Sequence, residues 1–455
     1  MLFPSSRAVL VSLSGRGRSS ASTASVVKSS RNSQSILTRR LAFRTATNLT
    51  WTQKATPAPT PQSPRRTTLF TPNTSDVFLS RRSFSTAPVD QSVSTFPSLL
   101  IGAESLTPQG SFAVAQATYL QPDAEAVQDL VDLLERTQSG IVAHYYMDVE
   151  LQGVLQAAGA RLPGRVGIAD SLKMGDMAVD MAANHNCTAI ACLGVDFMSE
   201  SVQAILQQNG HGHIPVLRAT HKPIGCSLAE SAERESYRVW LEQESVGQAA
   251  LHVVYINTSL ETKAVSQSIV PTITCTSSNV LQTLLQASAQ MGPELKILYG
   301  PDTYMGENLV TLLSTIEARW NDEQIASLHA SHSRDTIRAL RDSIAVFPSG
   351  NCVVHHMFGA SVVDLVRSSY DDCFVTAHLE VPGEMFEIAM ERSLDDRGVV
   401  GSTSDILNFI ARKVREAVNA DTTPATLKFI LGTEAGMVTS IVSSVQQILK
   451  QTGNG

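Results

Sequence analysis

The sequence predicts an α/β protein of three small α/β/α units with parallel sheets, related by a pseudo-threefold repeat around a central active site. The first observation is a pattern that occurs three times, in which an apolar strand ends at a polar residue and a helical pattern follows. The second is that a hydroxyl-rich helix start and then a glycine-containing strand end follow each copy in the same order. Strands that alternate with helices form parallel sheets with crossover helices.

The elements of the repeat can be followed along the chain. The opening strand and helix are "GIVAHYYMDVELQGVLQAA" (140–158), "LHVVYINTSLETKAVSQ" (251–267) and "CFVTAHLEVPGEMFEIAM" (373–390). The next helix starts within "ADSLKMGDMA" (169–178), "CTSSNVLQTLL" (275–285) and "GSTSDILNFI" (401–410). The closing strand, with an acid after its glycine, lies in "CLGVDFMSE" (192–200), "LYGPDTYMGEN" (298–308) and "ILGTEAGMVTS" (430–440). Because ligands bind beyond the carboxyl ends of parallel strands, we expect the polar strand ends to build one shared site.

The first ninety residues differ in composition from the rest of the chain. Residues 1–89 hold eleven Arg, two Lys and a single acid, Asp76, in a segment rich in Ser and Thr, which is typical of a transit peptide. In "RRSFST", Arg82 precedes a cleavage point between Phe84 and Ser85 that resembles a mitochondrial processing site. We therefore expect a mitochondrial protein, with the plastid as the alternative and an ordinary disordered tail as the third reading.

These patterns predict the domain organisation. We expect a transit peptide or disordered segment over 1–88, a linker over 89–124, and repeat units over 125–226, 227–352 and 353–455, the last one truncated. The residues after 89 carry 22 basic against 41 acidic groups, a balance that speaks against a nucleic-acid surface. No apolar run approaches the roughly 18 to 20 residues that span a bilayer, so we expect no membrane partner.

Six cysteines occur without CxxC spacing, and disulfides are not expected in a reducing organelle matrix. Cys226 and Cys352 each follow a glycine-containing turn near the end of one of the first two units. The same spacing places a third cysteine beyond Gly455. Three convergent thiolates suit a [4Fe-4S] cluster with one open iron, whereas zinc would need a fourth ligand such as His355 or His356.

A set of motifs connects these features to a known family. In chain order they are "AHYYMDVELQ", "ADSL", "GVDFMSE", "GCSLAE", "VVYINTSLETKA", "TCTSSN", "GPDTYMG", "CVVHHMFG", "AHLEVPGE", "GSTSDI" and "GTEAGMV", between about residues 125 and 450. Together they resemble the A-type quinolinate synthases, and most closely the eukaryotic, plant-like branch. In that family the third cluster cysteine lies in a C-terminal segment, and plant-type relatives often carry a SufE-like domain; neither is found in this sequence.

The resemblance implies a function. It implies a transferase that condenses iminosuccinate with dihydroxyacetone phosphate, losing phosphate and water, to give quinolinate in de novo NAD biosynthesis. An open-site [4Fe-4S] cluster would act as the Lewis acid. A functional link to an L-aspartate oxidase and to the iron-sulfur assembly machinery is also implied.

The resemblance carries roles to individual positions. Cys226 and Cys352 match the first two cluster ligands. Substrate-binding positions are matched by His144, Ser171, Tyr255, Asn257, Ser277 and Thr403. Ser277 and Thr403 are expected to open helices, where hydroxyls and free N–H groups favour carboxylate or phosphate. We expect proton transfer by Tyr146, His378 and Glu380, because closing the ring requires groups that give and take protons.

Two other functions stay open from the residues alone. One is a cluster-deficient ligand-binding protein derived from the same fold. The other is acyl transfer, with Cys352 as nucleophile and His355 or His356 as base. We expect this pair to meet poorly, because residues three or four apart on a strand are badly placed for a hydrogen bond. Only one of the two histidines can face inward on a strand, and the sequence does not decide which.

Overall fold

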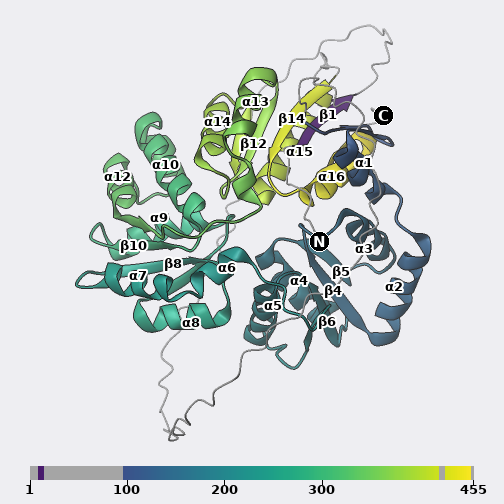
Figure 1. Cartoon of the computed structure of the whole chain (residues 1–455), viewed down its shortest axis with the longest axis horizontal. Helices are drawn as coiled ribbons and strands as arrows, with labels where there is room; N and C mark the ends of the chain where they lie inside the picture. Colours follow the sequence, from purple (N-terminus) through teal and green to yellow (C-terminus); the bar gives the residue numbers. More distant parts are fainter. Residues whose placement is uncertain (1–8, 15–95, 420–425, 452–455) are drawn as a thin grey trace, which may run out of the picture. The chain divides into compact units, whose positions relative to one another are not determined.

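Three β-sheets form the scaffold in a computed structural model, which describes residues 9–14, 96–419 and 426–451. The first sheet is parallel and has the order β5-β4-β6-β7. Its strands are β4 (Ser139–His144), β5 (Val166–Ala169), β6 (Ala189–Leu193) and β7 (Val216–Arg218). Its helices are α2 (Ala124–Thr137), α3 (Val149–Arg161), α4 (Ser171–Asn184) and α5 (Asp196–Gln208) (Figure 1).

The second sheet is also parallel and has the order β11-β10-β8-β9. Its strands are β8 (Ala250–Tyr255), β9 (Thr272–Cys275), β10 (Lys296–Gly300) and β11 (Ile344–Val346). Seven helices accompany it in this part of the chain: α6 (Ser227–Ala232), α7 (Glu235–Ser245), α8 (Leu260–Ile269), α9 (Val280–Met291), α10 (Thr303–Arg319), α11 (Asp322–Leu328) and α12 (Arg334–Ser343).

The third sheet has the order β13-β12-β14-β1-β2-β3. The strands β12 (Phe374–His378), β13 (Gly398–Gly401) and β14 (Thr426–Gly432) are parallel. The added strands are β1 (Val9–Ser14), β2 (Ser98–Ile101) and β3 (Leu106–Gln109), with β1 antiparallel to β14 and parallel to β2. The helices are α1 (Ser111–Ala117), α13 (Ala360–Ser369), α14 (Gly383–Leu394), α15 (Thr403–Asn419) and α16 (Met437–Gln451), with 3-10 turns η1 (Thr118–Leu120) and η2 (His355–Met357).

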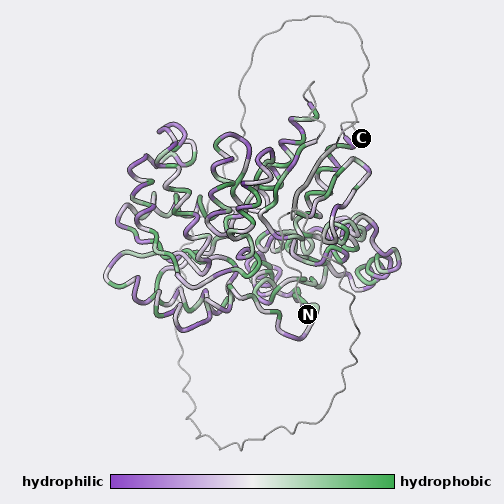
Figure 2. Tube along the Cα trace, turned by 45° about the horizontal axis from the view of Figure 1, so that its top comes forward, coloured by the Kyte–Doolittle hydropathy of each residue, from purple (hydrophilic) through white to green (hydrophobic). Residues whose placement is uncertain are grey.

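The predicted α/β class with parallel sheets is confirmed. In each of the strand sets β4–β6, β8–β10 and β12–β14, the first strand along the chain lies between the other two, and we call β4, β8 and β12 the central strands. Hydrophilic and hydrophobic residues alternate along the helices in Figure 2, as expected for helices that bury one face. The pseudo-threefold relation between the units stays a prediction.

Two segments differ from the expected domain organisation. The expected linker 89–124 contains β2, β3 and α1, and Leu99, Ile101 and Tyr119 pack in the same apolar core as α15 and α16. The apolar run in "FPSLLIG" forms β2, in which Leu99 and Ile101 are buried and Leu100 is half-buried. Within the expected transit segment, β1 pairs with both β14 and β2. The expected cleavage point after Phe84 lies outside the described residues.

The three loops that follow the central strands have the same length. We call residues 145–147, 256–258 and 379–381 the central-strand loops. Asp148 caps α3 by accepting from the Glu150 amide, and Ser259 caps α8 by accepting from the Thr262 amide. Pro382 takes the same place before α14 without a side-chain cap. In the first two loops, a side-chain cap at the same distance after the strand fixes where the loop ends.

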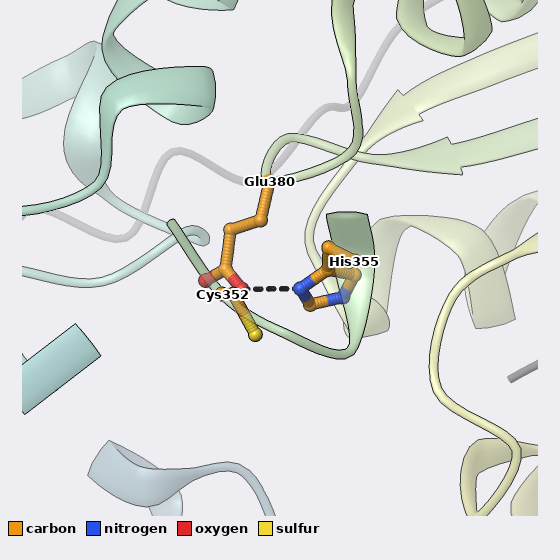
Figure 3. A group of neighbouring side chains, drawn as sticks. All are labelled: Cys352, His355 and Glu380. Atoms are coloured by element: carbon orange, nitrogen blue, oxygen red, sulfur yellow. Dashed lines mark ion pairs between the residues drawn. The ribbon is translucent and has the colours of Figure 1, made fainter. Parts of the chain in front are cut away.

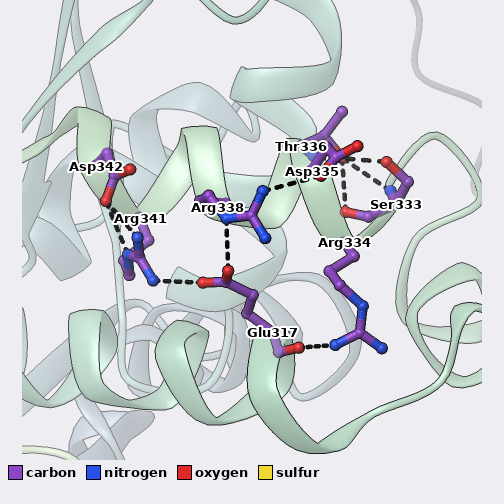
Figure 4. A network of polar contacts seen from close by, with 8 residues as sticks. All are labelled: Glu317, Ser333, Arg334, Asp335, Thr336, Arg338, Arg341 and Asp342. Atoms are coloured by element: carbon purple, nitrogen blue, oxygen red, sulfur yellow. Dashed lines mark hydrogen bonds and ion pairs between the residues drawn. The ribbon is translucent and has the colours of Figure 1, made fainter.

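Helix α12 is fastened to α10 by charged side chains (Figure 4). Glu317 on α10 lies 2.6 Å from Arg338 Nε and also pairs with Arg341, while Arg334 donates to the Trp320 carbonyl at 2.6 Å. Ser333 and Thr336 form a capping box at the start of α12, in which each side chain accepts from the backbone amide of the other residue. In the described part of the chain, none of the helices combines the length and apolar character needed to cross a membrane.

Candidate active site

The predicted site residues stand at the carboxyl ends of the central strands. His144 ends β4, Tyr255 ends β8 and His378 ends β12. Two positions further on, at the middle of the central-strand loops, stand Tyr146, Asn257 and Glu380. In a parallel sheet the carboxyl ends of all strands lie on the same edge, so each of these residues stands on the edge of its sheet where ligands bind.

Glu380 contacts two stacked imidazole rings. Its Oε2 is 2.8 Å from His355 Nδ1 and 4.0 Å from His378 Nδ1, and the two rings stack with centroids 5.1 Å apart. The contact with His355 is an ion pair and not an aligned hydrogen bond, because both buried ring nitrogens of His355 lack a hydrogen-bond partner. On its other side, His355 Nε2 lies 3.8 Å from Glu434 Oε2. The result is a buried group of alternating charge.

The pKa directions agree with that arrangement. Burial opposes ionisation of Glu380, but His355 and His378 outweigh it and hold its pKa at about 2. Burial also opposes protonation of His355, yet Cys352 and Glu380 raise its pKa well above the usual value. For His378, burial dominates and lowers the pKa. At neutral pH the site therefore holds a carboxylate and an imidazolium beside a neutral imidazole.

His144 and His378 are held in the same tautomer. The backbone amide of Tyr146 donates to His144 Nδ1 at 3.4 Å, and the amide of Glu380 donates to His378 Nδ1 at 3.4 Å. Burial lowers the pKa of His144 as it does that of His378. Each neutral ring then carries its proton on Nε2, where it can donate to a substrate oxygen.

A thiol joins this group. The Sγ of Cys352 and the ligand atoms of His355 and Glu380 all lie within 4.8 Å of one another (Figure 3). Cys226 is the N-cap residue of α6, and Ser227 Oγ donates to the Asn351 carbonyl at 3.4 Å, which joins the two cysteine segments. Burial raises the pKa of Cys226 to about 11, with further increases from Cys352 and Glu380. Cys352, His355 and Glu380 are close enough to one another to hold a metal ion.

Tyr146 and Tyr255 approach the group from two different sheets. Tyr255 is buried, and burial together with Glu380 raises its pKa well above the usual value. Tyr146 is 37% exposed, but neighbouring protein atoms still remove part of its hydration and raise its pKa, with the thiols of Cys226 and Cys352 adding to the shift. The Tyr146 hydroxyl accepts from the Val195 amide at 2.9 Å. Both phenols are therefore protonated and can donate hydrogen bonds.

Four predicted substrate positions occupy helix starts or loops. Ser171 and Thr403 are the first residues of α4 and α15 as expected, and Thr403 donates to Glu434 at 3.5 Å. The expectation that Ser277 opens a helix is wrong, because α9 begins at Val280 and Ser277 lies in the preceding turn, while its substrate-binding role stays a prediction. That turn is closed by the Asn279 side chain, which accepts from the Thr276 amide at 2.7 Å. Among the described residues, the contacts that join the buried group do not include Ser171, Asn257 or Ser277.

The structure decides between the two adjacent histidines. His355 is buried against Glu380, whereas His356 is exposed and its Nδ1 lies 2.6 Å from the Tyr304 hydroxyl. The expectation of a strand here is wrong, since residues 355–357 form a 3-10 turn. This turn brings His355 close to the Cys352 thiol, so our geometric reason against a cysteine–histidine pair does not hold.

Two site groups were missed by sequence reasoning. Glu434 contacts His355 and accepts from Thr433 at 2.6 Å, and despite burial these contacts hold its pKa below the usual range. Asp302 is fully buried with one carboxylate oxygen unpaired, and burial and Glu380 raise its pKa. The sequence could have pointed to both residues, because each is the acid that follows the glycine of the closing strand in its repeat unit.

Comparisons with known proteins identify the family. The family model described as Quinolinate synthetase A protein matches residues 128–451. The chain is similar to a chloroplastic quinolinate synthase of Arabidopsis thaliana, with 52% identity over 79% of this chain and 49% of the relative. It is 51% identical to a Nicotiana tabacum counterpart over 78% of this chain and 48% of that protein, and 27% identical to a quinolinate synthase of Ehrlichia chaffeensis over 62% and 68%.

The chain thus spans about half the length of the plant relatives it matches. Those relatives are named chloroplastic, which contradicts our mitochondrial expectation. An Arg-rich, acid-poor leader occurs in peptides for both organelles, so composition and a single processing-like motif could not separate them. The match over residues 128–451 and the identities to the plant enzymes show that the chain belongs to the quinolinate synthetase A family.

Proposed function

We propose that this chain is a quinolinate synthase that condenses iminosuccinate with dihydroxyacetone phosphate in de novo NAD biosynthesis. The observation that carries the proposal is the close group of Cys352, His355 and Glu380, with Glu380 just beyond the carboxyl end of the central strand β12, in a member of this family. The reaction needs donors for carboxylates and groups that exchange protons with carbon and nitrogen. The group offers both.

The residues divide these tasks by charge and protonation. Tyr255 and Asn257 bind the dicarboxylate as neutral donors. His144 and His378 both carry their proton on Nε2 and donate it in hydrogen bonds to carbonyl or hydroxyl oxygens. Glu380, ionised, accepts a proton from carbon, and Tyr146 supplies one. The amino ends of α4 and α15, at Ser171 and Thr403, favour carboxylate or phosphate.

The residues present fit an iron-sulfur cluster. Cys226 and Cys352 are half-buried thiols on joined segments, and Cys352 Sγ lies within 4.8 Å of ligand atoms of His355 and Glu380. We propose that these two thiols hold a [4Fe-4S] cluster, with the third thiolate that the family resemblance implies. When bound, the cluster supplies a Lewis acid at its open iron. The chain's own residues orient the substrate and move its protons.

Substitution of the two thiols tests this proposal. After anaerobic reconstitution of a protein that supplies all three thiolates, we expect about four iron and four sulfide per chain, and quinolinate formation from iminosuccinate and dihydroxyacetone phosphate. Cys226→Ser and Cys352→Ser should lose most of the iron and the product. Cys373→Ser is the control, because Cys373 is fully buried in the apolar core. Iron content and turnover unchanged in both ligand variants would contradict the assignment.

We place the protein in the plastid, with iminosuccinate supplied by an L-aspartate oxidase. The names of the plant relatives support the compartment, and the instability of an imine in water favours a nearby source. A fluorescent protein fused after residue 95 should enter plastids. Import into mitochondria alone would overturn this location.

A further inference from the structure

One amide side chain fastens both sides of the first central-strand loop. Gln152 on α3 donates through Nε2 to the carbonyl of Tyr145 at 2.8 Å and to that of Met147 at 2.7 Å. The residue between these two carbonyls is Tyr146. Gln152 is fully buried, so the two carbonyls have no competing solvent at this donor.

The second central-strand loop is fastened in the same way by a different donor. Lys263 on α8 donates through Nζ to the carbonyl of Ile256 at 3.1 Å and to the carbonyl of Thr258. The residue between them is Asn257. Lys263 follows Asn257 by six positions, the same separation as between Tyr146 and Gln152.

In the third loop the donor comes from another part of the chain. Asn308 on α10 donates through Nδ2 to the carbonyl of Leu379 at 2.9 Å and to that of Val381 at 2.7 Å, on either side of Glu380. The sixth position after Glu380 is Phe386, a fully buried core residue that has no donor. Asn308 is 2% exposed, and from α10 it supplies to the third loop the donor that position 386 lacks.

One group that binds both neighbouring carbonyls restricts the backbone dihedrals of the residue between them. That restriction sets the direction in which the middle side chain leaves the loop, and a misplacement of about 1 Å is enough to cost about 100-fold in rate. We propose that Gln152, Lys263 and Asn308 are positioning residues that aim Tyr146, Asn257 and Glu380, respectively, at the substrate. The inference rests on the proposed function of those three side chains.

Asn308→Leu tests the proposal at Glu380, because leucine has a similar volume and no donor. We expect kcat for quinolinate formation to fall by about 100-fold, with KM for iminosuccinate changed by less than about threefold. Thr376→Val is the matched control: it removes one buried bond, from Thr376 Oγ1 to the Ile430 carbonyl at 3.0 Å, on the strand that precedes the same loop. Equal losses of kcat in both variants, at equal melting temperature, would show a purely structural role and overturn the proposal.

Lys263 allows a rescue experiment that needs no turnover. Lys263→Met keeps the length of the side chain without donors, whereas Lys263→Gln copies the donor that the first unit uses at the same separation. With quinolinate as the probe in calorimetry, we expect the Kd to rise about tenfold or more in Lys263→Met, the loss of an aimed hydrogen bond, and to return to within about threefold in Lys263→Gln. Equal Kd values for the Met and Gln variants would contradict the proposal.

A crystal structure of the Asn308→Leu protein separates this inference from the proposed function. We expect Glu380 Oε2 to move away from its 2.8 Å contact with His355 Nδ1. Retention of that contact would overturn the positioning role even if the wild-type chain makes quinolinate. Conversely, a wild-type chain that makes no quinolinate would contradict the function, while the displaced carboxylate would still support the positioning role.

Discussion

At the scale of single residues, burial and neighbouring groups decide the chemistry. His144 and His378 are kept neutral by burial, and His355 is kept charged because its neighbours are Cys352 and Glu380. The same residue type therefore serves as a neutral donor in two places and as a cation in the third. Lys263 is a further case, because burial lowers its pKa to about 8 while Glu200 opposes the shift.

The depressed pKa of Lys263 predicts a pH dependence of stability. The unfolded chain holds the lysine proton more tightly than the folded one, so between about pH 8 and pH 10.5 the unfolded state binds more protons. The free energy of unfolding of the wild type should thus rise relative to that of Lys263→Gln across this window, by at most about 1.4 kcal/mol per pH unit. Chemical denaturation of both proteins at several pH values measures the difference. A difference that stays constant from pH 8 to pH 10 would show that Lys263 titrates normally.

At the scale of elements, side-chain caps and ion pairs hold helices around the site in place. The caps at Asp148, Ser259 and Asp302 start α3, α8 and α10 at fixed points. Helix α10 matters twice, because it carries Asn308 and also supports α12 through Glu317. Glu317 is only 15% exposed, so its charge is less screened than that of an ordinary surface carboxylate.

The contacts of Glu317 predict that replacing two acids by alanine, Glu317 and Asp335, lowers the melting temperature by unequal amounts. Glu317→Ala leaves Arg338 and Arg341 without their shared partner and should lower the melting temperature by about 2 °C or more. Asp335→Ala is the control, because Asp335 also pairs with Arg338 but is 87% exposed, and it should change the melting temperature by less than about 1 °C. Calorimetry of both variants decides. Similar shifts would mean that the network contributes no more than its exposed pair.

At the scale of the whole molecule, a few close approaches join the three sheets. Gln152 Nε2, which already binds the carbonyls of Tyr145 and Met147, also lies 3.2 Å from the carbonyl of Gly436, and Thr439 at the start of α16 donates to Gln152 Oε1. Asn308 joins α10 to the loop after β12. These bonds connect the first sheet and the second sheet to the third through the residues that flank Tyr146 and Glu380. The site therefore depends on how the units are held together.

The close approach of Gly436 to the first central-strand loop predicts that a side chain at this position lowers the stability of the protein. A Cβ at this position would lie 1.7 Å from the Tyr145 carbonyl oxygen, so Gly436→Ala must displace backbone and should destabilise the protein by about 3 kcal/mol. Gly383→Ala is the control, since its Cβ would meet nothing closer than Asn308 Oδ1 at 3.9 Å. Denaturant unfolding with iron removed compares the two. Equal stability would show that the approach relaxes without strain.

The sequence by itself determined the α/β class, the central strands and the polar residues at their ends, because period and chain order are local properties. It also pointed to Cys226 and Cys352 through their turns. Only the tertiary structure decided that His355 and not His356 is buried, that Ser277 precedes its helix, and that residues 98–101 and 106–109 are strands of the third sheet. It alone brought Asn308 to Glu380, which is 72 positions away in the chain. A donor's partner across that separation depends on how whole sheets pack, and no local pattern encodes it.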